Sequence, residues 1–152
     1  MGPIGHTVDM AVPARISIIT LGVADLARAT AFYESLGWRN TAQVSSIAFF
    51  ETQGSVLGLY EWSALADDAE VPAQGSGFRG VALAMNVEST AEVDAVFAAW
   101  VSAGATAKVE PHEAFWGGYS SYVADLDGHL WEIAYNPYAT IDADGRLVMG
   151  GG

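Results

Sequence analysis

GSVLGL at residues 54–59 and GHLWEI at residues 128–133 have the same sequence pattern, a turn glycine followed by mainly apolar strand residues. Upstream of each lies another run that predicts a strand, rich in β-branched residues at 15–23 and apolar at 80–87. The two sets occur in the same order along the chain. An internal repeat of this kind predicts a fold built from two similar units.

A helix is predicted after the first strand of each unit. In the first unit, apolar residues recur every three or four positions over 26–36, and Gly37 stands where a left-handed C-terminal cap belongs. In the second unit, Ser89 and Glu92 have capping-box spacing, and an apolar stripe runs from there to Gly104. Both units therefore begin with a strand and an amphipathic helix.

Three strands are predicted to complete each unit, near 38–44, 46–51 and 55–61 in the first and near 106–110, 118–124 and 129–135 in the second. The predicted fold is therefore α+β, with two tandem βαβββ modules forming a curled, barrel-like eight-stranded sheet around a pocket. The predicted divisions are a leader (1–13), a first module (14–62), an exposed linker (63–78), a second module (79–138) and a tail (139–152). The tail contains DADGR, which resembles a hairpin turn, and ends in three glycines that we expect to be disordered.

Composition narrows the classes of partner. Six Lys and Arg residues against 18 Asp and Glu give a formal charge of −12, which repels nucleic acid and anionic membranes. This charge is interpreted either as a solubility charge or as a preference for a cationic small molecule. No apolar stretch is long enough for a membrane span, and the start of the chain does not resemble a signal peptide, so we expect a cytoplasmic protein. The absence of cysteine excludes disulfides and thiolate metal sites.

Three motifs resemble the glyoxalase/bleomycin resistance protein/dioxygenase superfamily, also called the vicinal oxygen chelate superfamily. They are LGVADL (21–26), AFYESLGW (31–38) and DLDGHLWEI (125–133). The resemblance extends over about 14–138, and FWGGY (115–119) is similar to a subgroup of bacterial members. It implies the two-module fold and a homodimer.

In metal-using members of the superfamily, four strands each contribute one inward-pointing ligand. The corresponding positions here are Ile18, Gly58, Ala82 and Glu132, and only Glu132 is a ligand-type residue. A single carboxylate does not hold a divalent metal against dilution. The resemblance therefore implies a member without a metal, and we expect no other cofactor.

The histidines do not restore a metal site, and Glu132 keeps several roles. His6 lies in the leader, His112 precedes the FWGG segment, and His129 lies on the opposite strand face from Glu132. Glu132 is interpreted as a structural hydrogen-bond acceptor, a ligand anchor or a general base, and the sequence does not choose among them.

Strand alternation places a set of small and apolar side chains on the concave face with Glu132, and aromatic residues are expected around its mouth. The predicted ligand-binding residues are Ile18, Thr20, Phe49, Val56, Gly58, Tyr60, Trp62, Ala82, His112, Phe115, Trp116, Tyr119, Tyr122, Leu130 and Glu132. Gly117 and Gly118 indicate either a flexible or sharply turned loop over the pocket or a tight turn whose aromatic residues belong to the core.

Three functions fit these patterns. The first is a metal-free protein that binds a small molecule, cationic or aromatic, and sequesters a drug or metabolite such as an antibiotic. The second is a metal-independent lyase or isomerase that uses Glu132 as general acid or base, with His112 or Tyr60. The third is a conventional metalloenzyme, which the ligand count argues against. Whether the chain is an enzyme is left open by the sequence.

Overall fold

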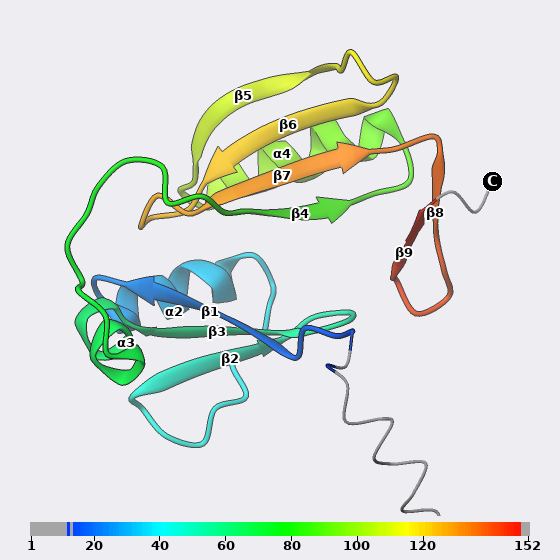
Figure 1. Cartoon of the computed structure of the whole chain (residues 1–152). Helices are drawn as coiled ribbons and strands as arrows, with labels where there is room; N and C mark the ends of the chain where they lie inside the picture. The colour runs from blue at the N-terminus through cyan, green and yellow to red at the C-terminus, as the bar shows by residue number, and fades with distance from the viewer. Residues whose placement is uncertain (1–11, 13, 150–152) are drawn as a thin grey trace, which may run out of the picture.

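The computed structural model describes residue 12 and residues 14–149. The expected leader, apart from residue 12, and the three terminal glycines lie outside these residues. Two sheets form the body of the molecule (Figure 1). The first has the strand order β1 (Ile18–Val23), β3 (Val56–Glu61), β2 (Ile47–Glu51), and the second β4 (Ala82–Asn86), β7 (Leu130–Tyr135), β6 (Tyr119–Ala124), β5 (Thr106–Glu113). In each sheet the edge strand that comes first in the chain pairs in parallel with its neighbour, and the other pairs are antiparallel.

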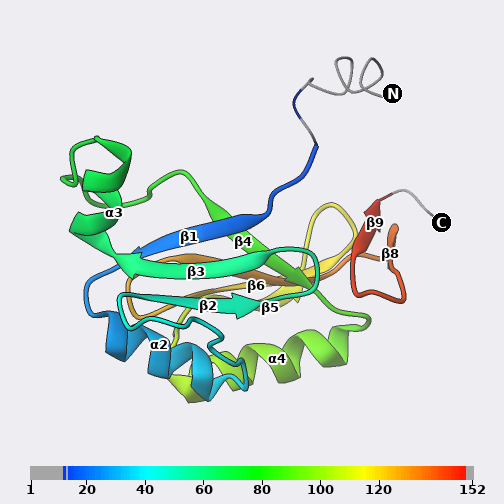
Figure 2. The same cartoon turned by 90° about the horizontal axis from the view of Figure 1, so that it is seen from below.

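Helix α2 (Leu26–Ser35) follows β1, and helix α4 (Thr90–Ala103) follows β4. Helix α4 begins at the predicted capping box, and helix α2 is capped in the same way. The Asp25 carboxylate accepts a hydrogen bond from the backbone N–H of Arg28, and the Ser89 hydroxyl accepts one from Glu92. The two helices lie on the same side of the sheets (Figure 2).

The predicted strand near 38–44 is absent, and only an isolated bridge joins Asn40 to Phe50. The carboxamide oxygen of Asn40 accepts hydrogen bonds from the backbone N–H groups of Ala42 and Phe49, both at 3.0 Å. A side chain thus satisfies donors that a strand ladder would otherwise use. The first half of the chain therefore has two strands after its helix, whereas the second half has three.

The expected single barrel-like sheet is also not found over the described residues. The seven strands of the body form two separate sheets, and β1 and β4 are their facing edges (Figure 1). The tail forms a separate two-stranded sheet of β8 (Ala139–Ile141) and β9 (Leu147–Met149), which confirms the predicted hairpin. The fold is α+β, with helices and mixed sheets.

Residues 63–78, expected as an exposed linker, begin with a helix. Helix α3 (Trp62–Ala69) is capped by Glu61, whose carboxylate accepts hydrogen bonds from the backbone N–H groups of Ser63 and Ala64. Glu70 ends the helix in the left-handed conformation, with φ of 57°. None of the helices in the described part of the chain is long and apolar enough to cross a membrane.

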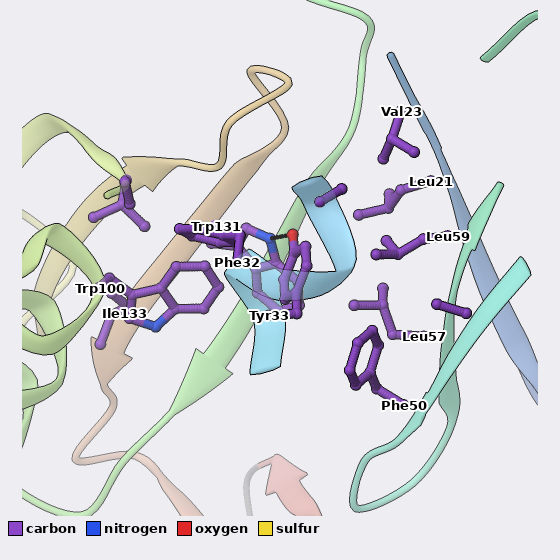
Figure 3. Packing of buried hydrophobic residues seen from close by; sticks show 14 of the residues in the cluster. Leu21, Val23, Phe32, Tyr33, Phe50, Leu57, Leu59, Trp100, Trp131 and Ile133 are labelled. Carbon is purple, nitrogen blue, oxygen red and sulfur yellow. Dashed lines mark hydrogen bonds between the residues drawn. The ribbon is translucent and has the colours of Figure 1, made fainter. Parts of the chain in front are cut away.

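One hydrophobic core serves both halves of the chain. Tyr33 of α2 lies against Trp100 of α4 and Trp131 of β7, with ring centroids 6.2 and 6.3 Å apart. Leu57 and Leu59 of β3 pack from the other side (Figure 3). The core residues of the strands, such as Leu57 and Leu59 of β3, alternate with residues whose side chains lie on the outer face, away from the helices. This is the period of a half-buried strand. The core therefore fixes which strand face remains available for a site.

Candidate functional site

The four positions that correspond to the metal ligands of the superfamily do not form a metal site. Ile18 is half exposed at 51%, Gly58 is buried beneath Thr20 and Phe49, and Ala82 is exposed. A β-carbon on Gly58 would lie 3.2 Å from the Thr20 hydroxyl oxygen. Within residues 14–149 and residue 12, no three His, Asp or Glu side chains are grouped so that they could hold a metal ion. The donor set does not fit a resident metal.

Glu132 lies half-buried on the outer face of the second sheet. Its Oε2 accepts a hydrogen bond of 2.6 Å from the Ser120 hydroxyl, and Tyr122 and Ala84 flank it on the neighbouring strands. Burial raises the pKa of Tyr122, and the nearby charge of Glu132 raises it further. Glu132 thus accepts a short hydrogen bond from Ser120 and lies beside the Tyr122 phenol.

The remaining predicted site residues of the first sheet share its outer face. Thr20 and Gly58 are paired across β1 and β3, as are Phe49 and Gly58 across β2 and β3. Val56 and Tyr60 have the same strand parity and are half-buried. This face and the face that holds Glu132 belong to separate sheets.

The segment around Gly117 forms a tight turn. Its backbone N–H donates to the Ala114 carbonyl, and the Ala114 N–H donates to the Gly118 carbonyl. The Trp116 ring occupies the space in which a Gly118 side chain would stand, and Phe115 is fully exposed. The segment is thus sharply turned, but the exposure of Phe115 shows that its aromatic residues are not both in the core.

Tyr119 and His112, two further predicted residues, lie on opposite faces of the second sheet, because His112 pairs with Ser120 on the face that holds Glu132. Tyr119 has the opposite strand parity from Tyr122, and its hydroxyl donates to Asp94 of α4 at 2.8 Å. This hydrogen bond raises the pKa of Tyr119. His112 is exposed on β5, where its Nδ1 lies 3.0 Å from the Glu110 carbonyl oxygen.

Two cavities lie along the seam between the facing edges β1 and β4, since Ile19 and Leu83 line both. The larger, about 1100 Å³, is bounded by the β8–β9 turn and is here called the hairpin cavity. The smaller, about 740 Å³, is bounded by α3 and is called the α3 cavity. Glu132 lines neither of them. Among the predicted residues, Val56 and Ala82 line the hairpin cavity, and Thr20, Trp62 and Leu130 line the α3 cavity.

Trp62 is the centre of the α3 cavity. Its ring packs on Gly22, where a β-carbon would lie 3.0 Å from the ring, and it stacks with His129 at 6.1 Å between centroids. Its indole N–H donates to the Ala73 carbonyl at 3.0 Å, and the Arg79 guanidinium lies 5.1 Å from the ring centroid. These contacts hold the indole in one position and connect α3 to the segment that follows it.

The other walls of the α3 cavity come from segments distant in sequence. Leu65, Ala66 and Ala69 continue the face of α3 that begins with Trp62. The turn before β7 supplies His129, whose Nε2 donates to the Gly22 carbonyl at 2.7 Å. That bond fixes the ring on the first half of the chain, so the cavity wall crosses the seam.

Several of these lining residues were missed at the level of sequence. The spacing of Trp62, Leu65, Ala66 and Ala69 is that of a helix face, so an amphipathic helix could have been predicted there. Arg79 and Lys108 carry no comparable signal, because only the packing of the two halves brings them to one cavity.

The sequence matches the family profile of the Glyoxalase/Bleomycin resistance protein/Dioxygenase superfamily over residues 15–133. The chain belongs to this superfamily. A glyoxalase-related enzyme from Fulvimarina pelagi is 35% identical, with 91% of this chain and 100% of that chain covered and a TM-score of 0.82. The comparison with curated proteins gave no match.

Two solved structures with lower sequence identity are also similar to this chain. A hypothetical protein from S. aureus is 20% identical, with a TM-score of 0.74 over 85% of this chain and 98% of that chain. A lactoylglutathione lyase from Agrobacterium tumefaciens is 22% identical, with a TM-score of 0.63 over 82% of this chain and 95% of that chain. At these identities the likeness shows the shared fold.

Proposed function

We propose that the chain binds a small organic molecule in the α3 cavity and does so without a metal. The observation that carries this proposal is the cavity itself, about 740 Å³ in volume, whose lining is mostly apolar and built around the fixed indole of Trp62. Sites for small molecules combine an apolar lining with a few placed polar groups. Three of the four superfamily metal-ligand positions hold residues without a donor side chain, which agrees with binding that needs no metal.

The proposal is tested by thermal shift with a panel of aromatic metabolites and cationic antibiotics, because a ligand that binds only the folded state raises the melting temperature. Antibiotics are included because bleomycin resistance is part of the superfamily name, and drug sequestration is the specific form of this proposal. Ala66→Trp fills the cavity and abolishes the shift. The matched control Ser63→Trp, at an exposed position of α3, retains it. Equal shifts in both variants would place the ligand elsewhere.

A second proposal is a metal-independent lyase or isomerase that uses Glu132. The short hydrogen bond from Ser120 and the adjacent Tyr122 phenol favour it, since together they provide a carboxylate and two hydroxyls on one sheet face. Incubating a panel of carbonyl metabolites as candidate ligands with native protein and with Glu132→Gln tests this, with NMR as the readout because an isomer has the same mass as its substrate. Conversion by native protein alone supports catalysis, and no conversion by either rejects it for those ligands.

The homodimer and the cytoplasmic location stay predictions from the sequence. Light scattering coupled to size-exclusion chromatography measures the mass of the particle and so tests the dimer directly.

A further inference from the structure

The α3 cavity carries charged side chains of one sign. Arg79 and Lys108 are among its lining residues, and none of the lining residues is Asp or Glu. This is notable in a chain with three times as many acidic as basic residues, 18 against six. The hairpin cavity differs, because Arg39 and Arg146 share its lining with Glu51, Glu88, Glu92 and Asp142.

The Arg79 guanidinium contacts Trp62 in the wall of the α3 cavity. It lies over the Trp62 ring at 5.1 Å from the centroid, a cation–π contact. It also lies close against Gly75, where a β-carbon would be 2.9 Å from a guanidinium nitrogen. The Trp62 ring that the guanidinium contacts is itself held by Gly22, His129 and Ala73.

The apolar and cationic parts of the lining come from different segments. The apolar face of α3 contributes Leu65, Ala66 and Ala69, whereas the two cationic groups come from the segment after α3 and from β5. A ligand that matches this lining has an apolar body and at least one negative charge. Arginine and lysine recognise carboxylates and phosphates through charge-assisted hydrogen bonds.

We propose that the α3 cavity is a site for a small organic anion with an apolar body, such as an arylalkyl carboxylate. This inference rests on the proposed function and specifies its ligand class. The net charge of −12 alone predicts a cationic ligand. At contact distance, however, the nearest charges dominate, because salt screens charges more than about 8 Å away.

A matched probe series tests the charge preference. The probes are 2-naphthylacetate, 2-(2-naphthyl)ethanol and 2-(2-naphthyl)ethylamine, which share one ring system and differ in charge. Isothermal titration calorimetry on the full chain is expected to give a dissociation constant about tenfold lower for the carboxylate than for the alcohol, and the weakest binding for the amine. The preference decreases as salt is raised.

The double variant Arg79→Gln and Lys108→Gln is expected to bind carboxylate and alcohol equally. The matched control is Arg39→Gln and Arg146→Gln, which changes the net charge by the same amount in the hairpin cavity and retains the preference. Circular dichroism and the melting temperature establish that all variants are folded. A merely global charge effect would reduce the preference equally in both double variants.

The outcomes separate the two proposals. If the alcohol or the amine binds as tightly as the carboxylate, or if the Arg79 and Lys108 variant keeps the preference, the anion inference is overturned while binding in the cavity stands. If the carboxylate binds Ala66→Trp unchanged, the site lies elsewhere and the inference is also overturned. If none of the three probes binds, the anion inference is overturned, and the thermal-shift panel alone decides whether the cavity binds a small molecule.

Discussion

Asp125 shows how a single buried side chain joins parts of the molecule that are far apart in sequence. Its Oδ1 accepts hydrogen bonds from the backbone N–H groups of Asp127 and His129, both at 2.9 Å. Its Oδ2 accepts one of 2.6 Å from the Tyr33 hydroxyl, which in turn accepts from the Trp131 indole at 3.1 Å. Buried polar groups need such partners. The DLDGH motif therefore builds the turn that carries His129 to the α3 cavity.

At Tyr33, removal of the hydroxyl by Tyr33→Phe leaves the Asp125 carboxylate and the Trp131 N–H each short of one buried partner. We expect the free energy of unfolding to fall by about 1–3 kcal/mol. Urea denaturation followed by circular dichroism measures it. Tyr60→Phe, on the half-buried outer face of β3, is the control, and an equal loss there would contradict this account.

The same phenol predicts a loss of stability in alkali. Burial raises the pKa of Tyr33 above its usual value of 10.0, and the charge of Asp125 raises it further. Below pH 10 both states keep the proton, whereas above it the unfolded state loses the proton first. The stabilising contribution is therefore lost as pH rises, by up to about 1.4 kcal/mol per pH unit. Urea titrations at about pH 9 and pH 11 should show a steeper loss in native protein than in Tyr33→Phe. An equal loss of stability between the two pH values in both proteins would contradict this role of Tyr33.

At the scale of the element, α3 shows how composition can mislead. Its Ala and Asp residues precede a stretch rich in Pro and Gly, and together they resemble an exposed linker. The helix nevertheless forms, because Glu61 caps it and its apolar face lies over β1 and β3. None of its residues is fully buried. Helix α3 is therefore expected to open more easily than α2 or α4.

The cap provides a test. Glu61→Ala removes the acceptor for the backbone N–H groups of Ser63 and Ala64. A lost N-cap costs about 1 kcal/mol, so amide exchange within Leu65–Ala69 should become about fivefold faster while α4 is unchanged. Hydrogen exchange followed by NMR measures these amide exchange rates residue by residue. Glu51→Ala, an exposed carboxylate at the end of β2, should leave α3 exchange as it is.

At the scale of the whole molecule, the two sheets are held together by side chains across the seam. The Asp127 carboxylate accepts from the Ala24 N–H at 2.8 Å, and His129 donates to Gly22. Beneath them, the shared aromatic core joins α2 to α4, with Phe32 and Trp100 centroids 6.1 Å apart. A cavity at the seam is thus bounded by both halves.

Because the core is shared, the chain should unfold in one transition rather than half by half. Tryptophan fluorescence and far-ultraviolet circular dichroism are expected to give coincident urea curves. Asp127→Ala should lower the midpoint, with a cost of about 1 kcal/mol for the lost hydrogen bond, and leave the curves coincident. Two separate transitions in the native protein would show that the halves fold independently.

The sequence by itself determined the helices α2 and α4, seven strands of the body and the tail hairpin, because each is set by local spacing, capping residues and turn glycines. It also identified the superfamily through its motifs, and it predicted that three of the four metal-ligand positions hold no donor side chain. The strand near 38–44 was wrong because one side chain, Asn40, took the hydrogen bonds of the ladder.

Only the tertiary structure decided where the cavities lie and what lines them. Glu132, which strand parity placed at the centre of a pocket, lines neither of the two seam cavities and accepts a hydrogen bond from Ser120. Arg79, Lys108 and His129 are distant in sequence, yet they line one cavity because the seam brings the two halves together. Local patterns specify which face of a strand is apolar, but the separation and packing of two sheets depend on long-range contacts.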